Sequence, residues 1–235
     1  LNEARASITD LIKTEMIEAL AVCFIHSYAN PTNEQAVAEM ARSEFPALYV
    51  TASADVVPTM REYERWSTTC INAYTQPMFD RYLGRLETGL EKSGFTGKLF
   101  IMTSSGGVLS PDAARQFPVR MLESGPAAGV LMSSLHGRNL DLPELLSFDM
   151  GGTTAKASLI RDGEIEITAE YEVGGSGSQN RWVTGTGLRF ECPSSTWPRS
   201  APEAGASPGS TQQVPCAWGQ AAPARNLARF ATARA

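Results

Sequence analysis

Hydrophobic and polar positions along the first half of the chain follow a helical period in some stretches and form continuous apolar runs in others. Residues 7–19 predict a helix, because apolar side chains recur on one stripe and Ser7 is a suitable N-cap. That stripe consists of Ile8, Leu11, Ile12, Met16 and Ile17. Residues 20–25, LAVCFI, predict a short strand buried on both faces. Residues 30–45 open with an Asn-Pro pair and predict a second helix.

The same two patterns continue toward the middle of the chain and then change. Residues 47–53 predict a strand, and residues 63–92 predict a long helix that is broken or kinked near Pro77. The next predicted elements are a strand that runs into glycines at 98–107 and a helix capped by Ser124 at 123–135. Strands are predicted last, at 145–150, 154–160 and 164–173, with Asp162-Gly163 as a hairpin turn.

This order of elements predicts an α/β fold. Helices alternate with buried strands in the first half, whereas a β-meander follows later. A single continuous sheet does not account for both halves, so we expect two sheets.

Composition narrows the classes of partner. The chain has 235 residues, a net charge of -5 and a pI of about 5.2. This mild acidity argues against nucleic acid or an anionic membrane as the main partner. The sequence has no apolar run that would span a bilayer, and its start lacks the pattern of a signal peptide. We therefore expect a cytoplasmic protein, whose initial Leu indicates a start inside a longer chain.

Cysteine and histidine usage favours no metal centre. Cys23 and Cys70 lie in apolar patterns and are expected to be buried, reduced thiols. With His26 and His136 as the two histidines, this chain cannot build a histidine-rich metal site by itself.

The stretch SFDMGGTTAK, residues 147–156, combines groups that suit phosphate. Two glycines after a strand expose backbone N–H groups, to which two threonine hydroxyls and one cation are added. An acid at the strand end could bind hydrated Mg²⁺ or orient a water molecule. The residues concerned are Asp149, Gly151, Gly152, Thr153, Thr154 and Lys156. The alternative interpretation is an ordinary hairpin turn.

Two further turns of small residues strengthen the phosphate interpretation. MTSSGGV ends a strand with Ser104, Ser105, Gly106 and Gly107. ESGPAAGV opens a helix, and helix N-termini attract anions through their free N–H groups. Three such turns within one α/β chain favour a phosphate ligand more than any of them does alone.

The motifs HSYANPTNE, REYERWSTTCINAYTQP, TSSGG, ESGPAAGV and FDMGGTTAKASLI, in this order, closely resemble the hydantoinase A / 5-oxoprolinase family, which also contains N-methylhydantoinases and acetophenone carboxylase-like proteins. The resemblance runs from the first residue to about Gly187. It implies an ATP-dependent hydrolase of hydantoin- or 5-oxoproline-type cyclic amides, which phosphorylates the substrate's carbonyl oxygen. It also implies an actin/Hsp70-like fold of two RNase H-like lobes, the cofactors ATP and Mg²⁺, and a possible B-type partner subunit.

The resemblance also assigns roles to residues. Asp149 and Lys156 would be catalytic, and Asp149 would bind the metal. ATP would be held by Gly151, Gly152, Thr153, Thr154, Ser105, Gly106, Gly107, Ser124 and Gly125. In transfers of this kind, positioning and neutralisation of charge provide most of the catalysis.

Three residues outside these turns have two interpretations each. His26 follows a predicted strand, where strand ends often carry function, although a structural bond to a backbone carbonyl is the simpler expectation. Arg61 and Arg65 in REYER could anchor a carboxylate or form local ion pairs at a solvated helix start.

The chain departs from the family at both ends. The family's first phosphate loop is absent, so we expect an incomplete fold. Residues 1–140 would be the end of the first lobe with the interlobe helices, and residues 141–187 the first strands of the second. Residues 188–235 change abruptly to a composition rich in Ala, Pro, Arg, Ser and Gly, which is typical of disorder.

Codon arithmetic suggests a different origin for this tail. Residues 193–206, PSSTWPRSAPEAGA, can be back-translated so that reading from the third base of each codon gives IIDMAEIGAGGGS. That string resembles the family's own continuation. The sequence therefore predicts a frameshift near residues 187–190.

Because both lobes would contribute to a phosphate site, we expect little or no turnover from this chain alone. Two other functions remain open on the sequence: a phosphotransferase of the same superfamily, and a non-catalytic remnant or binding module. The sequence does not identify the substrate among hydantoins, 5-oxoproline and ketones destined for carboxylation.

Overall fold

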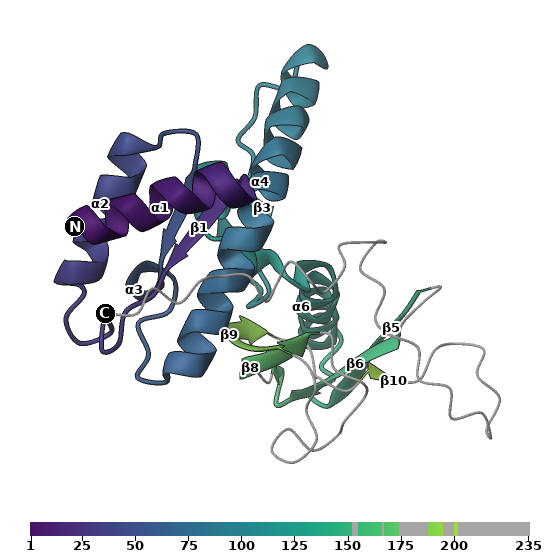
Figure 1. Ribbon diagram of the computed structural model, residues 1–235. Helices are drawn as coiled ribbons and strands as arrows, with labels where there is room; N and C mark the ends of the chain where they lie inside the picture. The colour runs from purple at the N-terminus through teal and green to yellow at the C-terminus, as the bar shows by residue number, and fades with distance from the viewer. Residues whose placement is uncertain (152–154, 166, 174–187, 195–199, 202–235) are drawn as a thin grey trace, which may run out of the picture. The chain divides into compact units, whose positions relative to one another are not determined.

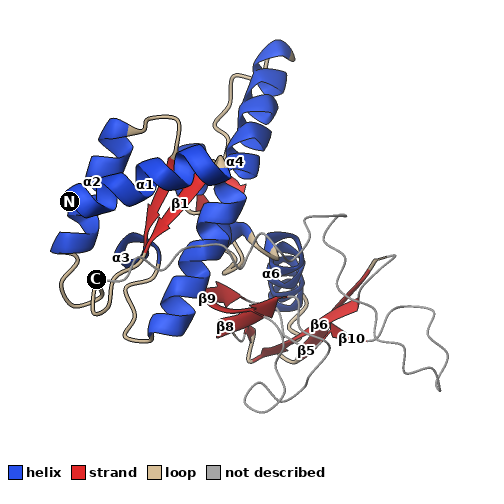
Figure 2. Ribbon diagram, viewed as in Figure 1, coloured by secondary structure: helices blue, strands red, loops and turns tan. Residues whose placement is uncertain are grey.

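The computed structural model describes residues 1–151, 155–165, 167–173, 188–194 and 200–201 (Figures 1 and 2). The described residues form two compact units. Unit 1 contains residues 1–98 and 111–119, and unit 2 contains residues 99–110 and the described residues from 120 onward. The lobe boundaries expected from the sequence stay predictions.

Unit 1 is built on a two-stranded parallel sheet. Its strands are β1 (Ala19–Val22) and β2 (Tyr49–Ala52), paired from Ala19↔Tyr49 to Val22↔Ala52. A parallel pair requires a crossover, which here is a helix. The helices of the unit are α1 (Asn2–Glu15), α2 (Thr32–Glu44), α3 (Ser53–Val56), α4 (Glu62–Lys92) and α5 (Pro111–Gln116).

Alternate residues of β2 face two different layers, as strand geometry requires. Val50 and Ala52 are buried in an apolar core with side chains of α1 and α2. Tyr49 and Thr51 face the long helix α4, where the Tyr49 hydroxyl donates to Asp80 at 2.7 Å and the Thr51 hydroxyl donates to Gln76 at 3.1 Å. The result is a helix–sheet–helix arrangement (Figure 1).

Unit 2 is mainly antiparallel. A short ladder joins β3 (Ile101–Met102) to β4 (Val108–Leu109), and the 3₁₀ helix Pro118–Met121 leads into α6 (Ser124–Asn139). The main sheet contains β5 (Leu145–Met150), β6 (Ala155–Arg161), β7 (Glu164–Ile165) and β10 (Ser200–Ala201). A separate ladder joins β8 (Thr168–Val173) to β9 (Leu188–Ser194).

Several sequence predictions are confirmed. The α/β class, the presence of more than one sheet and the late meander all appear. The Asp162-Gly163 turn joins β6 to β7, and both turn residues have positive φ, as a two-residue type I′ hairpin requires. Among the described residues, no helix is both long and apolar enough to cross a bilayer.

The ends of the helices differ from the sequence predictions in several places. The first helix begins at Asn2, so Ser7 is an interior residue and not its cap, and Met16 is a left-handed C-terminal residue with 82% of its surface exposed. Of the predicted break or kink at Pro77, the break is wrong, because α4 continues through this buried proline, and the kink stays a prediction. The Ser124 cap is also wrong. Glu123, with φ 66°, is the cap residue of α6, and Ser124 is the first helical residue.

Candidate functional site

The three turns singled out as phosphate-binding in the sequence all belong to unit 2. TSSGG connects β3 to β4, ESGPAAG begins α6, and Gly151, the first residue of GGTT, follows β5. Gly152, Thr153 and Thr154 lie outside the described residues. The remaining predicted site residues can be placed, and two side chains show how the turns are held.

Ser104 ties the β3–β4 turn to the segment that leads into α6. Its side chain is fully buried, and its hydroxyl lies 2.8 Å from the carbonyl oxygen of Arg120 and also contacts that of Leu122. The Ser104 N–H donates to the same Arg120 carbonyl at 2.8 Å. The turn therefore lies directly beside the residues that precede Glu123.

The β3–β4 turn uses much of its own hydrogen-bonding capacity. Gly106, at φ 85°, donates its N–H to the Thr103 carbonyl, and Gly107 donates its N–H to the Thr103 hydroxyl at 3.1 Å. These two glycines therefore shape the loop and do not offer bare N–H groups to a ligand. Ser105 is exposed, with its hydroxyl 3.0 Å from that of Thr103.

Asp149 and Lys156 lie directly opposite each other on the antiparallel strands β5 and β6. Cross-strand neighbours of this kind have Cβ atoms about 5 Å apart, so both side chains share one face of the sheet. Asp149 is exposed, whereas the Lys156 side chain is 20% exposed and forms an ion pair with Glu123. Glu123 was assigned no role from the sequence, in which it appears only as the first letter of ESGPAAGV.

The first turn of α6 completes the cluster. Ser124 and Gly125 are the first two helical residues, whose N–H groups have no partner within the helix by geometry. Gly125 is exposed, and a Cβ added there would meet nothing within 4 Å. The site so far contains an exposed carboxylate, a paired ammonium and a helix N-terminus, which together suit a phosphate ligand with a hydrated cation.

The motifs HSYANPTNE and REYER meet in unit 1 in a separate buried network. Glu34 and Arg65 are both fully buried. The Glu34 carboxylate accepts hydrogen bonds from the N–H groups of Phe24 and Ala54, both at 2.7 Å, and from the Ser53 hydroxyl at 2.8 Å. Arg65 donates to the same Ser53 hydroxyl and to the carbonyl oxygens of Phe24 and Thr59.

The structure places the three residues whose interpretation the sequence left open, of which Arg65 belongs to this network. Arg65 is a buried structural residue that also lies 5.6 Å from the centre of the Tyr28 ring, whereas the exposed Arg61 pairs with Glu64 at 3.9 Å. His26 is exposed at φ 56°, and its carbonyl accepts two backbone bonds.

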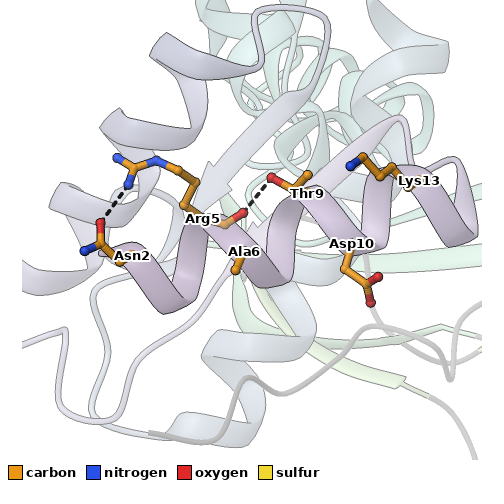
Figure 3. Close-up of a pocket in the computed structure, with 6 residues that line it drawn as sticks. All are labelled: Asn2, Arg5, Ala6, Thr9, Asp10 and Lys13. Atoms are coloured by element: carbon orange, nitrogen blue, oxygen red, sulfur yellow. Dashed lines mark hydrogen bonds between the residues drawn. The ribbon is translucent and has the colours of Figure 1, made fainter.

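Other features of the described residues are less suited to chemistry. Burial raises the pKa of the Cys23 and Cys70 thiols, which makes them poor nucleophiles. No group of three metal-ligating side chains occurs in the described part of the chain. Figure 3 shows a surface depression whose residues all come from one helix, α1. Because it has no second wall, it is a weaker candidate than the cluster in unit 2.

Comparisons with known proteins agree with the resemblance seen in the sequence. The profile described as Hydantoinase/oxoprolinase matches residues 65–192, and the one described as its N-terminal region matches residues 2–45. The uncharacterized protein MJ0964 of Methanocaldococcus jannaschii is 39% identical over 82% of this chain and 28% of its own length. Caprolactamase subunit alpha of Pseudomonas jessenii is 29% identical over 69% of this chain and 23% of its own.

Solved structures resemble this one as well. The nucleotide-free structure of acetone carboxylase, an enzyme of ATP-dependent acetone carboxylation, has a TM-score of 0.66 and 26% identity over 86% of this chain. The ATP-dependent caprolactamase from Pseudomonas jessenii has a TM-score of 0.61 and 31% identity over 66% of this chain. The present chain spans 27% and 22% of those two chains.

Proposed function

Since the chain belongs to the hydantoinase/oxoprolinase family, we propose that it carries the second-lobe phosphate site of an ATP-dependent hydrolase of cyclic amides. The proposed fold is of the actin/Hsp70-like type, with the described residues forming part of it. Substrates of the hydantoin or 5-oxoproline class suit this proposal, because the matching family is described as Hydantoinase/oxoprolinase. ATP suits it because both structural relatives named above are described as ATP-dependent.

One observation carries the proposal: the turns predicted to bind phosphate belong to one compact unit. They are joined by the buried Ser104 and by the ion pair between Lys156 and Glu123. Nothing in the local sequence of each turn requires this convergence.

The proposed reaction uses ATP to make an amide oxygen a better leaving group. The γ-phosphoryl group moves to the carbonyl oxygen of the cyclic amide, so that one P–O bond forms and the bond to ADP breaks. Water then adds to the carbonyl carbon, and the ring nitrogen leaves as an amine. A second water releases phosphate from the resulting acyl phosphate, leaving a carboxylate. Lys156 and the first turn of α6 would neutralise phosphate charge during the transfer.

Mg²⁺ would be held by Asp149. Mg²⁺ in nucleotide sites commonly takes one or two carboxylates together with phosphate oxygens and water. A single exposed carboxylate at the end of β5 fits this pattern, and a cage of protein ligands is not needed.

The proposal predicts that the purified chain binds ATP in the presence of Mg²⁺ but hydrolyses little of it. Asp149→Asn removes the carboxylate and should weaken MgATP binding about tenfold or more, measured by isothermal titration calorimetry. Asp112→Asn is a matched control, because Asp112 lies in unit 1 with 97% of its side chain exposed.

Two results would contradict the proposal. One is an equal loss of affinity in the two variants, and the other is an absence of ATP binding by the wild-type chain. Rapid ATP hydrolysis that Asp149→Asn abolishes would contradict the expected inactivity of the isolated chain.

A partner subunit is part of the same proposal. The relative caprolactamase is described as an alpha subunit, which implies at least one other subunit in that protein. In this chain, β5 exposes Leu146, Phe148 and Met150, with 58–64% of their surfaces accessible. Such an apolar row is consistent with a site that a B-type subunit would cover.

A further inference from the structure

Glu123 occupies an unusual backbone position for an acidic residue. It adopts the left-handed conformation, with φ 66° and ψ 17°, immediately before the first residue of α6. Residues other than Gly, Asn and Asp seldom adopt this backbone conformation. Glu123 therefore lies at the start of the helix, and its carboxylate reaches Lys156 of β6.

The carboxylate at this position forms an ion pair with Lys156, and solvent reaches little of either group. The Glu123 side chain is 13% exposed and the Lys156 side chain is 20% exposed. A partly buried ammonium without a counter-charge is unfavourable, so Glu123 stabilises Lys156 while no ligand is bound.

The same ion pair between Glu123 and Lys156 opposes the binding of a phosphate. Lys156 is paired with Glu123 and lies opposite Asp149 in the β5–β6 register, so a second acid shares its face of the sheet. A phosphate next to this cluster would meet acidic groups whose charge Lys156 already compensates. It gains the full attraction of the ammonium only if one carboxylate withdraws.

We propose that Glu123 is the counter-ion of Lys156 in the empty site and that a nucleotide phosphate replaces it. This inference rests on the proposed function and adds a residue that sets the affinity of the site. Glu123 is thus a positioning residue, which holds the Lys156 side chain at the site until a phosphate takes over its charge. No covalent step is involved.

The test is a double-mutant cycle on ATP binding by the full chain with Mg²⁺, measured by calorimetry. Glu123→Gln should tighten binding about tenfold, because Lys156 no longer has to leave a carboxylate. In a Lys156→Met background the same Glu123 substitution should have a much smaller effect. Glu123→Gly removes the carboxylate and also relieves the left-handed strain, so it serves if the glutamine variant folds poorly.

Glu164→Gln is the matched control. Glu164 lies in the same unit, is 83% exposed and forms its own ion pair with Arg138 at 3.1 Å, so the change in net charge is identical. Its affinity for ATP should equal that of the wild type.

Weaker ATP binding by Glu123→Gln, or an equal gain with and without Lys156, would overturn the inference. Failure of the wild-type chain to bind ATP would instead contradict the proposed function, so the two failures are distinguishable.

Discussion

Two residues of the same chemical type can have very different roles in this chain. Arg65 is fully buried and bonds three separate segments, whereas Arg81 is 60% exposed and pairs with an exposed glutamate at 3.2 Å. Nothing in REYER distinguishes a buried arginine from an anchor for a ligand. Asp149 and Lys156 could be singled out from the sequence because they flank a glycine turn, and their roles stay predictions. Glu123 could not, since a left-handed backbone leaves no mark on a glutamate.

This contrast predicts different costs for the same substitution. Arg65→Met should destabilise the protein by about 3–5 kcal/mol, because Glu34 would stay buried without a nearby positive charge. Arg81→Met, the matched control, should cost about 1 kcal/mol or less. Urea unfolding followed by circular dichroism measures both changes. Similar midpoints for the two variants would mean that the Arg65 network contributes little.

At the scale of elements, periodicity predicted most helices and strands, and tertiary contacts decided where they end. The strand expected at 98–107 shortens to Ile101–Met102, because Thr103 and Gly107 close a hairpin. Pro77 was expected to break or kink α4. The helix continues, and Tyr49, Thr51 and the last residue of α5 bond its side chains on either side of the proline.

Two glycines of α6 differ in how closely neighbouring residues pack against them. A Cβ at Gly137 would lie 2.9 Å from the Leu142 carbonyl oxygen, and the Leu145 side chain would also be too close. Gly137→Ala should therefore destabilise unit 2 by about 1–3 kcal/mol. At Gly129 a Cβ would meet nothing within 4 Å, so Gly129→Ala should stabilise the helix by up to about 1 kcal/mol.

Thermal unfolding of the Gly137→Ala and Gly129→Ala variants measures both changes in stability. Opposite shifts in Tm are expected from the same Gly→Ala change in one helix. Shifts of the same sign would show that α6 does not pack against Leu142 and Leu145 in this way.

At the scale of the whole molecule, the sequence predicted an α/β protein of a known family, and both are confirmed. The two compact units could not be read from it, since residues 111–119 join unit 1 although residues 99–110 belong to unit 2. Hydrophobic periodicity describes local faces and contains no information about such an exchange. The actin-like type of fold stays a proposal.

The tail gives a prediction at this scale. If the frameshift over residues 188–235 is a sequencing artefact, resequencing the codons for residues 172–200 from fresh genomic DNA should restore a frame that continues into IIDMAEIGAGGGS. Mass spectrometry of the native protein is an independent check. Native peptides that match residues 193–206 as printed would contradict a sequencing artefact and would mean that the tail is translated as it stands.

The exchange of segments between the units has a consequence for synthesis on the ribosome. Asn72 in α4 bonds the carbonyl of Gln116 at 3.0 Å and the N–H of Val119 at 3.2 Å, and Arg115 pairs with Asp80 of the same helix. The β3–β4 hairpin of unit 2 must therefore leave the ribosome before residues 111–119 can pack on α4 and complete unit 1. A single proteolytic or genetic cut cannot separate the units, because the chain passes between them three times within its described residues.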